Sequence, residues 1–199
     1  PEDPVSKNVS HFVMFVEMDD KRFFLERFIN ENPESRIIVF VRTRVRAERV
    51  SKAMERVGIK VFAIHGEKDQ AHRSNVMERF KRGDRNILIA TDVSARGIDI
   101  PDVHYVVNYD MPVEPEYYVH RVGRTGRAFS KGDAISFCSS EEKEQLEAIQ
   151  KLLNKKIEEI KISKKKYSLA LEHPSDEASI EDLIQEQEVW EKNKRKKRK

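Results

Sequence analysis

The chain reads ILIATDVSARGIDIP from Ile87 to Pro101. Its first four residues are apolar and predict a strand that is buried on both faces, as in a parallel sheet. The polar residues that begin at Thr91 then form a loop at the carboxyl end of this strand. Open α/β sheets bind their ligands at that end of their strands. The stretch therefore predicts a parallel α/β sheet with a binding site directly after the strand.

Two further segments repeat this design. The apolar residues 37–41 and 61–64 are each followed by a polar cluster. The first cluster contains Arg42 and Thr43, and the second contains Gly66, Gln70 and Arg73. Right-handed crossovers between such strands produce a doubly wound, mostly parallel α/β sheet with helices on both faces.

Apolar runs alternate with amphipathic segments along most of the chain. Strands are expected at residues 11–16, 36–41, 60–64, 86–91, 103–108 and 133–138. Helices are expected at residues 21–30, 45–57, 70–82, 114–122 and 141–153. Their apolar residues recur at helical spacing, which marks the faces that cover the sheet. Gly58 and Gly83 each follow an expected helix, and we interpret them as its carboxyl cap.

Residues 120–127 read HRVGRTGR, with three arginines and two glycines. Arginine keeps a planar fork of donors charged at any relevant pH, and glycine lets a backbone approach a ligand closely. Arg124 and Arg127 would lie on one side of a helix end, where both could reach one triphosphate. We interpret the segment as a phosphate-binding surface of the arginine-finger type. The alternative is a solvated loop or a nonspecific basic patch.

Together, these clusters resemble the motifs of the carboxyl-terminal RecA-like domain of DEAD-box RNA helicases. The segments that resemble motifs IV, IVa, V and VI are residues 40–43, Gln70-x-x-Arg73, residues 91–99 and residues 120–127. His120 and the Gln70-x-x-Arg73 pair favour this family over other superfamily 2 helicases, whereas Val122 stands where the family usually has Ile. We take residues 1–162 as the RecA-like domain and residues 163–199 as a carboxyl-terminal extension.

The resemblance implies a role for each motif residue. Arg124 and Arg127 are implied as catalytic arginine fingers on the γ-phosphate, and Asp99 as a ligand of the nucleotide ribose. The implied contacts to the RNA backbone come from Arg42, Thr43, Gly66, Arg73 and Thr91. The implied coupling to a partner domain comes from Gln70, Arg96, His120 and Arg121. Taken alone, Gly66 would be a simple turn, Arg73 a surface charge and Asp99 a loop carboxylate.

The phosphate-loop pattern G-x-x-x-x-G-K-[ST] is absent from the chain. The chain therefore lacks both the loop that cradles ATP phosphates and the hydroxyl that holds Mg²⁺. We expect ATP and Mg²⁺ to be bound mainly by an amino-terminal RecA-like domain outside this chain. We expect neither a metal site nor ATPase activity in the chain alone. Asp176-Glu177-Ala178-Ser179 differs by one letter from the family's namesake motif, but it lies in a polar tail and not after an apolar strand.

The resemblance implies the second motor domain of an ATP-dependent RNA helicase, whose partners are RNA and the amino-terminal domain. Its grip on the RNA backbone would be independent of sequence. Two alternatives stay open. One is an RNA- or protein-binding module of RecA-like fold without a catalytic role. The other is a DNA-directed helicase domain of superfamily 2, which would not depend on the 2′-OH of RNA.

Composition sets broader bounds. A chain of 199 residues suits one domain with an appendage, and its formal net charge of +3 says little about partners. The single cysteine, Cys138, lies in an apolar run, which suits core packing in a reducing cytoplasm. Because no apolar stretch is long enough to span a bilayer, we expect a soluble, cytoplasmic protein without a membrane partner. The opening at Pro1, without Met, suggests an excised fragment.

The tail contains two opposed runs of charge. Residues 172–191 hold eight acidic side chains and no Lys or Arg, whereas residues 192–199 hold seven Lys or Arg. A thin apolar stripe could line one side of a helix that runs to Trp190. We expect the extension to be partly helical or disordered and to be a candidate site for a protein partner. Its basic end would either attract RNA phosphates or aid solubility.

Overall fold

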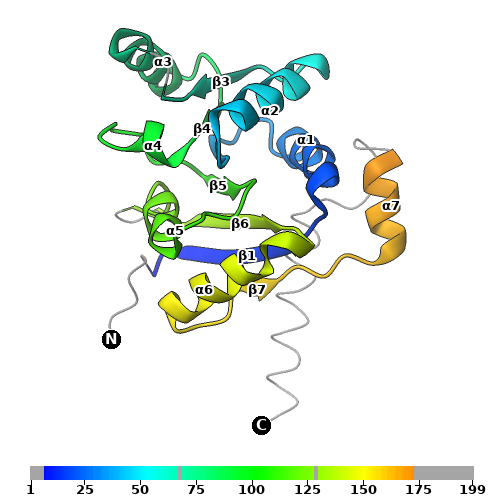
Figure 1. Ribbon diagram of the computed structural model, residues 1–199. Helices are drawn as coiled ribbons and strands as arrows, with labels where there is room; N and C mark the ends of the chain where they lie inside the picture. Colours follow the sequence, from blue (N-terminus) through cyan, green and yellow to red (C-terminus); the bar gives the residue numbers. More distant parts are fainter. Residues whose placement is uncertain (1–6, 67–68, 128–129, 173–199) are drawn as a thin grey trace.

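A sheet of seven strands lies at the centre of the part of the chain that the computed structural model describes, residues 7–66, 69–127 and 130–172 (Figure 1). The strands are β1 (Val9–Phe15), β2 (Ile37–Phe40), β3 (Val61–Ile64), β4 (Ile87–Ala90), β5 (Tyr105–Asn108), β6 (Gly132–Cys138) and β7 (Glu158–Glu159). They are ordered β3-β4-β2-β5-β6-β1-β7, and each neighbouring pair is parallel. The predicted doubly wound α/β class is confirmed.

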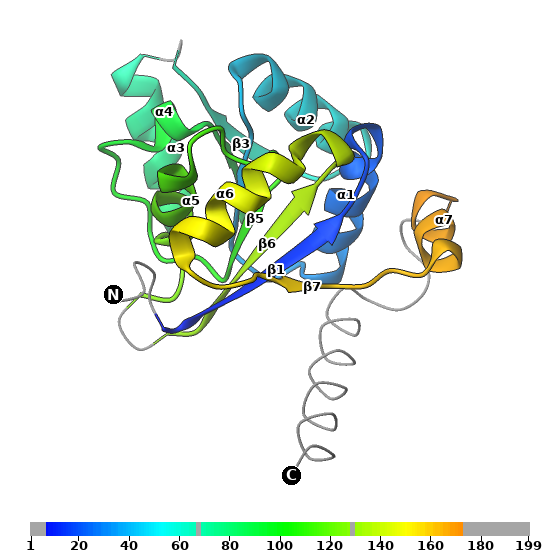
Figure 2. The same cartoon turned by 60° about the horizontal axis from the view of Figure 1, so that its bottom comes forward.

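Helices lie on both faces of this sheet (Figure 2). They are α1 (Lys21–Glu31), α2 (Arg44–Arg56), α3 (Gln70–Arg82), α4 (Asp92–Ala95), α5 (Pro115–Val122), α6 (Lys143–Leu153) and α7 (Lys164–Glu172). Two short 3₁₀ turns, η1 (Met18–Asp20) and η2 (Ser140–Glu142), precede α1 and α6.

The central strand β2 shows how the two faces are filled. Ile37 and Val39 pack with apolar residues of α1 and α2, whereas Ile38 and Phe40 pack on the opposite face with residues of α3 and α4. A further cluster joins β1 and β6 to α5 and α6. All four residues of β2 are thus buried, two on each face, as expected for a parallel sheet covered on both sides.

Most predicted elements agree with the observed ones to within a few residues, and α3 has the predicted bounds. Gly83 is the carboxyl cap of α3 with a φ of 83°, and Gly58 follows the end of α2 with a φ of 82°. The predicted helix at 141–153 is divided, because a capping box between Ser139 and Glu142 closes the η2 turn before α6 begins. The helix α4 and the strand β7 were not predicted, since four and two residues carry too little periodicity.

The helix α7 lies in the predicted extension and packs against α1. The ring of Tyr167 lies 5.0 Å from that of Phe24, centroid to centroid. The Tyr167 hydroxyl donates to Asp20 Oδ2 (2.6 Å) and accepts from the Glu17 N–H (3.0 Å). Ala170 is buried in the core cluster that α1 and α2 share. The predictions for residues 173–199, including the helix that runs to Trp190 and the basic end, lie outside the described residues.

Cys138 lies in the core at the end of β6, as predicted. Burial, with a smaller contribution from the charge of Glu142, raises the pKa of its thiol to about 11. Within residues 7–66, 69–127 and 130–172, no helix is both long and apolar enough to span a membrane.

Tyr167→Ala should detach α7, because it removes the ring contact with Phe24 and both hydrogen bonds to the segment before α1. We expect the free energy of unfolding to fall by about 1–2 kcal/mol, measured with urea. Hydrogen exchange of the amides of residues 164–172 should become faster. Lys165→Ala, at an exposed position of the same helix, is the control. Unchanged exchange in Tyr167→Ala would show that the contacts of Tyr167 do not hold α7 against α1.

Candidate functional site

Most of the predicted site residues follow the carboxyl ends of neighbouring strands. Because β3, β4, β2 and β5 are adjacent and parallel, the loops after their carboxyl ends emerge side by side (Figure 1). The loops after the first three strands carry Gly66, Gln70 and Arg73, then residues 91–99, then Arg42 and Thr43. Residues 120–127 come from the end of α5 and the turn that follows it. The sheet therefore brings three of the sequence clusters to its carboxyl edge. Arg124 and Arg127 instead bond Val103 and Ile100, which precede the amino end of β5.

A pocket of 290 Å³ lies between α4 and α5. Its lining includes Asp92, Arg96, Tyr117, His120, Arg121 and Arg124. The guanidinium of Arg96 lies 4.8 Å from the centroid of the Tyr117 ring. The pocket joins the segment at 91–99 to the segment at 120–127, and it contains more positive than negative side chains. Such a surface favours an anion.

Arg121 is the buried support of this pocket, with 1% of its surface exposed. Its Nε and Nη2 donate to the two carboxylate oxygens of Asp92, at 2.6 and 2.7 Å. Its Nη1 donates to Asn108 Oδ1 (3.2 Å) and to the carbonyl of Asp110 (2.7 Å). Arg121 was expected to couple two domains, and in this structure its guanidinium is buried and hydrogen-bonded within its own chain.

Arg124 and Arg127 lie beyond the end of α5. Arg127 donates to the carbonyls of Gly123 (2.9 Å) and Ile100 (3.0 Å), which hold its guanidinium in place. Burial lowers the pKa of Arg124, the nearby charge of Arg127 lowers it further, and Asp99 partly opposes both effects. The two predicted arginine fingers and Asp99 therefore lie within electrostatic reach of one another. A bound anion would relieve the repulsion between the two arginines.

A second pocket, of 260 Å³, lies between α3 and the loop after α4. Gln70, Arg73, Lys81 and Asp99 are among the residues that line it. Asp99 is exposed and accepts from Lys81 Nζ at 3.1 Å. Arg73 donates through Nη2 to the Ser94 carbonyl (2.7 Å), whereas its buried Nε has no hydrogen-bond partner among the described residues. A buried donor without a partner is costly, which makes Arg73 receptive to an acceptor.

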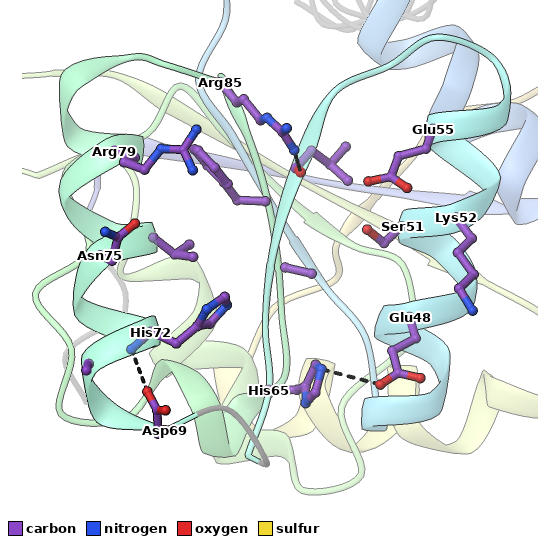
Figure 3. A pocket seen from close by; sticks show the side chains of 15 residues that line it. Glu48, Ser51, Lys52, Glu55, His65, Asp69, His72, Asn75, Arg79 and Arg85 are labelled. Carbon is purple, nitrogen blue, oxygen red and sulfur yellow. Dashed lines mark hydrogen bonds and ion pairs between the residues drawn. The ribbon is translucent and has the colours of Figure 1, made fainter.

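The loop that contains Gly66 is anchored on both sides, at the end of a groove of 970 Å³ between α2 and α3 (Figure 3). His65 Nε2 lies 3.5 Å from Glu48 Oε1 on one side, and Asp69 caps α3 by accepting from the His72 N–H (2.6 Å) on the other. Gly66 itself is exposed, and a Cβ at its position would meet nothing within 4 Å. The fold leaves room there for a close approach from outside.

Thr91 is already engaged within the chain. It caps α4 through a capping box, in which its hydroxyl accepts from the Ser94 N–H (3.3 Å) and its own N–H donates to Ser94 Oγ (3.0 Å). The resemblance implied that Thr91 contacts the RNA backbone. Because the structure uses its hydroxyl and N–H internally, a phosphate would have to replace these bonds.

The end of β2 is tied to a buried group of charges. Arg42 donates its backbone N–H to Asp110 Oδ2 (2.9 Å), and Thr43 caps α2 by accepting from the Arg46 N–H (3.2 Å). Glu142 accepts from the backbone N–H groups of Ser139 and Met111, each at 3.0 Å. Its carboxylate also bonds the fully buried Lys21 Nζ. The loops after β2, β5 and β6 are thereby held together.

Gly126 serves packing and not ligand approach. Its φ is 64°, and a Cβ at this position would lie 2.4 Å from Val9 Cγ2. The glycines at 123 and 126 were interpreted as openings for a ligand. At Gly126 the close neighbour is instead the start of β1.

Comparisons with known proteins agree with this arrangement. Residues 20–129 match the helicase conserved C-terminal domain family. The ATP-dependent RNA helicase DBP8 of Lodderomyces elongisporus is 41% identical over 77% of this chain and 35% of its own length. A crystal structure of the E. coli DEAD-box protein SrmB, bound to regulator of ribonuclease activity A, has a TM-score of 0.74 and 35% identity over 79% of this chain and 93% of that chain.

The chain belongs to the DEAD-box RNA helicases. It is a carboxyl-terminal RecA-like domain of this family, as the motifs predicted. S. cerevisiae Dbp5 bound to RNA and ADP BeF3 has a TM-score of 0.74 and 30% identity over 87% of this chain and 47% of that chain. The chain spans about a third of the length of the curated relatives it matches, 35% of DBP8 and 34% of the Kluyveromyces lactis rRNA helicase RRP3.

Sequence reasoning missed the residues that hold this DEAD-box site together. Asp92 and Asn108 fix Arg121, and the group of Lys21, Asp110 and Glu142 supports Arg42. Asp92 lies inside the recognised motif at 91–99, and this position was the one available signal. Lys21 and Glu142 are 121 positions apart, and no local pattern connects them.

Within the described ranges, no group of three or more His, Cys, Asp and Glu is placed to hold a metal ion. The pocket between α4 and α5, which has an excess of positive side chains, suits phosphate oxygens better than a cation.

Asp92→Ala should destabilise the domain strongly, because it leaves the buried guanidinium of Arg121 without its carboxylate. We expect the free energy of unfolding in urea to fall by about 3 kcal/mol. Val93→Ala, at the exposed neighbouring position of α4, is the control and should change it by less than about 0.5 kcal/mol. Equal stability of the two variants would contradict the support that we assign to this pair.

Acid should reduce the stability that the buried charges around Glu142 give to the folded domain. Burial raises the pKa of this carboxyl, but the charge and hydrogen bond of Lys21 and two backbone N–H groups outweigh burial and hold the pKa below its ordinary value of 4.5. A depressed pKa means that the unfolded state binds more protons in acid, so this contribution is present above pH 4.5 and is lost as pH falls through the folded pKa.

The test compares Glu142→Gln with the unsubstituted chain by urea unfolding between pH 3 and pH 7. At pH 7 we expect Glu142→Gln to be less stable by about 3 kcal/mol. This difference should shrink steadily below the ordinary pKa of 4.5. A difference that stays constant with pH would mean that the pKa of Glu142 is not depressed in the folded domain.

Proposed function

We propose that this chain is the second motor domain of an ATP-dependent RNA helicase, in which RNA-stimulated ATP hydrolysis drives strand separation. The observation that carries the proposal is the pair Arg124 and Arg127, two guanidiniums whose mutual repulsion is only partly offset by Asp99. Two such groups beside a positive pocket are suited to a polyphosphate. The membership of the chain in the DEAD-box family supports the same conclusion.

ATP would lie between this domain and an amino-terminal RecA-like domain that also holds Mg²⁺. Arg124 and Arg127 then act as arginine fingers: their charges stabilise the negative charge that develops on the transferred phosphoryl group. Asp99 binds the ribose hydroxyls. Because its present bond to Lys81 is on the surface, exchanging that partner for a ribose costs little.

RNA would be gripped through its backbone by Arg42, Thr43, Gly66, Arg73 and Thr91. The partnerless Nε of Arg73 and the open space at Gly66 support this assignment. Contacts to the backbone carry no direct base information, so a grip of this kind is independent of sequence. The related Dbp5 structure, bound to RNA and ADP BeF3, supports RNA as the ligand.

Gln70, Arg96 and His120 are exposed and couple this domain to the amino-terminal one. Arg121, which is buried, holds the neighbouring residues of this surface in position. Because no phosphate loop is present, the chain alone is inactive as an ATPase, and turnover requires the amino-terminal domain and RNA.

Arg127→Ala and Arg124→Ala should each lower the RNA-stimulated kcat by roughly 10³-fold in a mixture of this chain with the amino-terminal domain. RNA affinity should stay near its original value, because neither residue contacts RNA. Arg82→Ala, an exposed arginine at the far end of α3, is the matched control. Unchanged turnover in both variants would refute the finger assignment.

The same mixture separates the alternatives. A competent partner domain that yields no ATPase with this chain would favour a binding module. Stimulation by DNA as strong as by RNA would favour a DNA-directed motor.

A further inference from the structure

Two buried carboxylates, those of Asp110 and Glu142, lie beneath the end of β2, with 1% and 2% of their side chains exposed. Lys21, at the start of α1, approaches them from the interior. Its Nζ donates to Glu142 Oε2 and to the Tyr109 carbonyl (2.7 Å), and it lies 4.0 Å from Asp110 Oδ1. One fully buried ammonium thus lies within ion-pair distance of both carboxylates.

Two arginines approach the same carboxylates from the solvent side. Arg46 Nε lies 2.8 Å from Asp110 Oδ2, a close pair. Arg42 is held less tightly: its Nη2 lies 3.4 Å from Glu142 Oε1 and 3.4 Å from the Met111 carbonyl. Charged hydrogen bonds of full strength measure about 2.7–2.9 Å. With 37% of its side chain exposed, the head of Arg42 is only loosely bound to its own domain.

The charge balance explains why Arg42 is loosely held. Asp110 has Arg46, and Glu142 has Lys21, so two carboxylates are balanced before Arg42 is counted. Without Lys21, Glu142 would be a buried carboxylate with Arg42 as its nearest remaining cation. In a medium of low dielectric that attraction is strong, and it would compete directly with an RNA phosphate for the guanidinium.

We propose that Lys21 is a positioning residue, which neutralises Glu142 from within and so leaves the Arg42 guanidinium available to RNA. This inference rests on the proposed function, since it needs Arg42 to bind the RNA backbone. Lys21 itself never reaches the ligand. It acts through Glu142, and its effect is to keep one cation of the RNA-binding edge uncommitted.

A purely structural role for Lys21 makes different predictions. If Lys21 only stabilised the fold, Lys21→Met would weaken the domain and leave the mobility and RNA contact of Arg42 unchanged. Removing the competing carboxylate could not then repair RNA binding. The experiment therefore follows Arg42 itself, with and without RNA.

The first readout needs no RNA. Exchange of the Arg42 side-chain N–H with water is measured by NMR in the full 199-residue chain. We expect exchange several-fold slower in Lys21→Met, because Glu142 captures Arg42, and faster in Glu142→Gln, because the competitor is removed. Lys52→Met, which removes one exposed lysine from α2, is the control for the lost charge. Unchanged Arg42 exchange in both variants overturns the inference whatever RNA does.

The second readout is the affinity for a fluorescein-labelled oligouridine, measured by anisotropy at several KCl concentrations with the amino-terminal domain present. Arg42→Ala should weaken binding about tenfold and lower the salt slope by about one. Lys21→Met should do the same, without adding to Arg42→Ala. Lys21→Met combined with Glu142→Gln should restore the affinity.

The outcomes distinguish the RNA-binding role of Arg42 from the positioning role of Lys21. If Arg42→Ala leaves RNA binding unchanged, the RNA role of Arg42 in the proposed function is wrong. If Arg42→Ala weakens binding but Lys21→Met does not, only the positioning role is wrong. Should Lys21→Met fail to fold, Glu142→Gln still decides under conditions where urea unfolding shows that it is folded. There, a loss of RNA affinity overturns the inference, and an affinity equal to or above the original supports it.

Discussion

The site depends on the burial of one guanidinium, that of Arg121. Taking a charge out of water costs several kcal/mol, and the cost is met only when carboxylates and carbonyls surround it in good geometry. Asp92, Asn108 and the Asp110 carbonyl provide that environment, and they come from α4, β5 and the loop after it. Because α5 brings Arg121 to all of them, the pocket between α4 and α5 has one defined shape.

The arginines at this edge divide by how completely the chain satisfies them. Arg121 is paired with both carboxylate oxygens of Asp92 at 2.6 and 2.7 Å, and Arg46 lies 2.8 Å from the buried carboxylate of Asp110. Arg42 has long contacts, Arg73 has a buried donor without a partner among the described residues, and Arg124 faces another arginine. An incompletely satisfied cation is attracted to phosphate, so these contacts make Arg42, Arg73 and Arg124 candidates for a ligand.

The sequence predicted the sheet and most helices because apolar runs and helical periodicity report burial directly. It also predicted which loops meet, since parallel strands place their carboxyl ends at one edge. It could not predict that the hydroxyl and N–H of Thr91 form a capping box with Ser94. Nor could it predict that Val9 leaves no room for a side chain at position 126. Both depend on neighbours distant in sequence or on bonds inside a four-residue helix. The sequence did not predict the group of Lys21, Asp110 and Glu142 either, because no local pattern marks charged residues that pair in the interior.

The electrostatics also explain why these arginines need a second surface. Two unit charges 4 Å apart interact by about 1 kcal/mol in water, but by about 4 kcal/mol at the effective dielectric of a protein boundary. Arg124 and Arg127 are both partly exposed in this domain, so water weakens their attraction for a triphosphate. Covering them with another domain would exclude that water and strengthen each contact severalfold. If Arg124 and Arg127 are the proposed fingers, domain closure would be the step that makes them effective, because the chain alone holds their charges without the water-excluding environment.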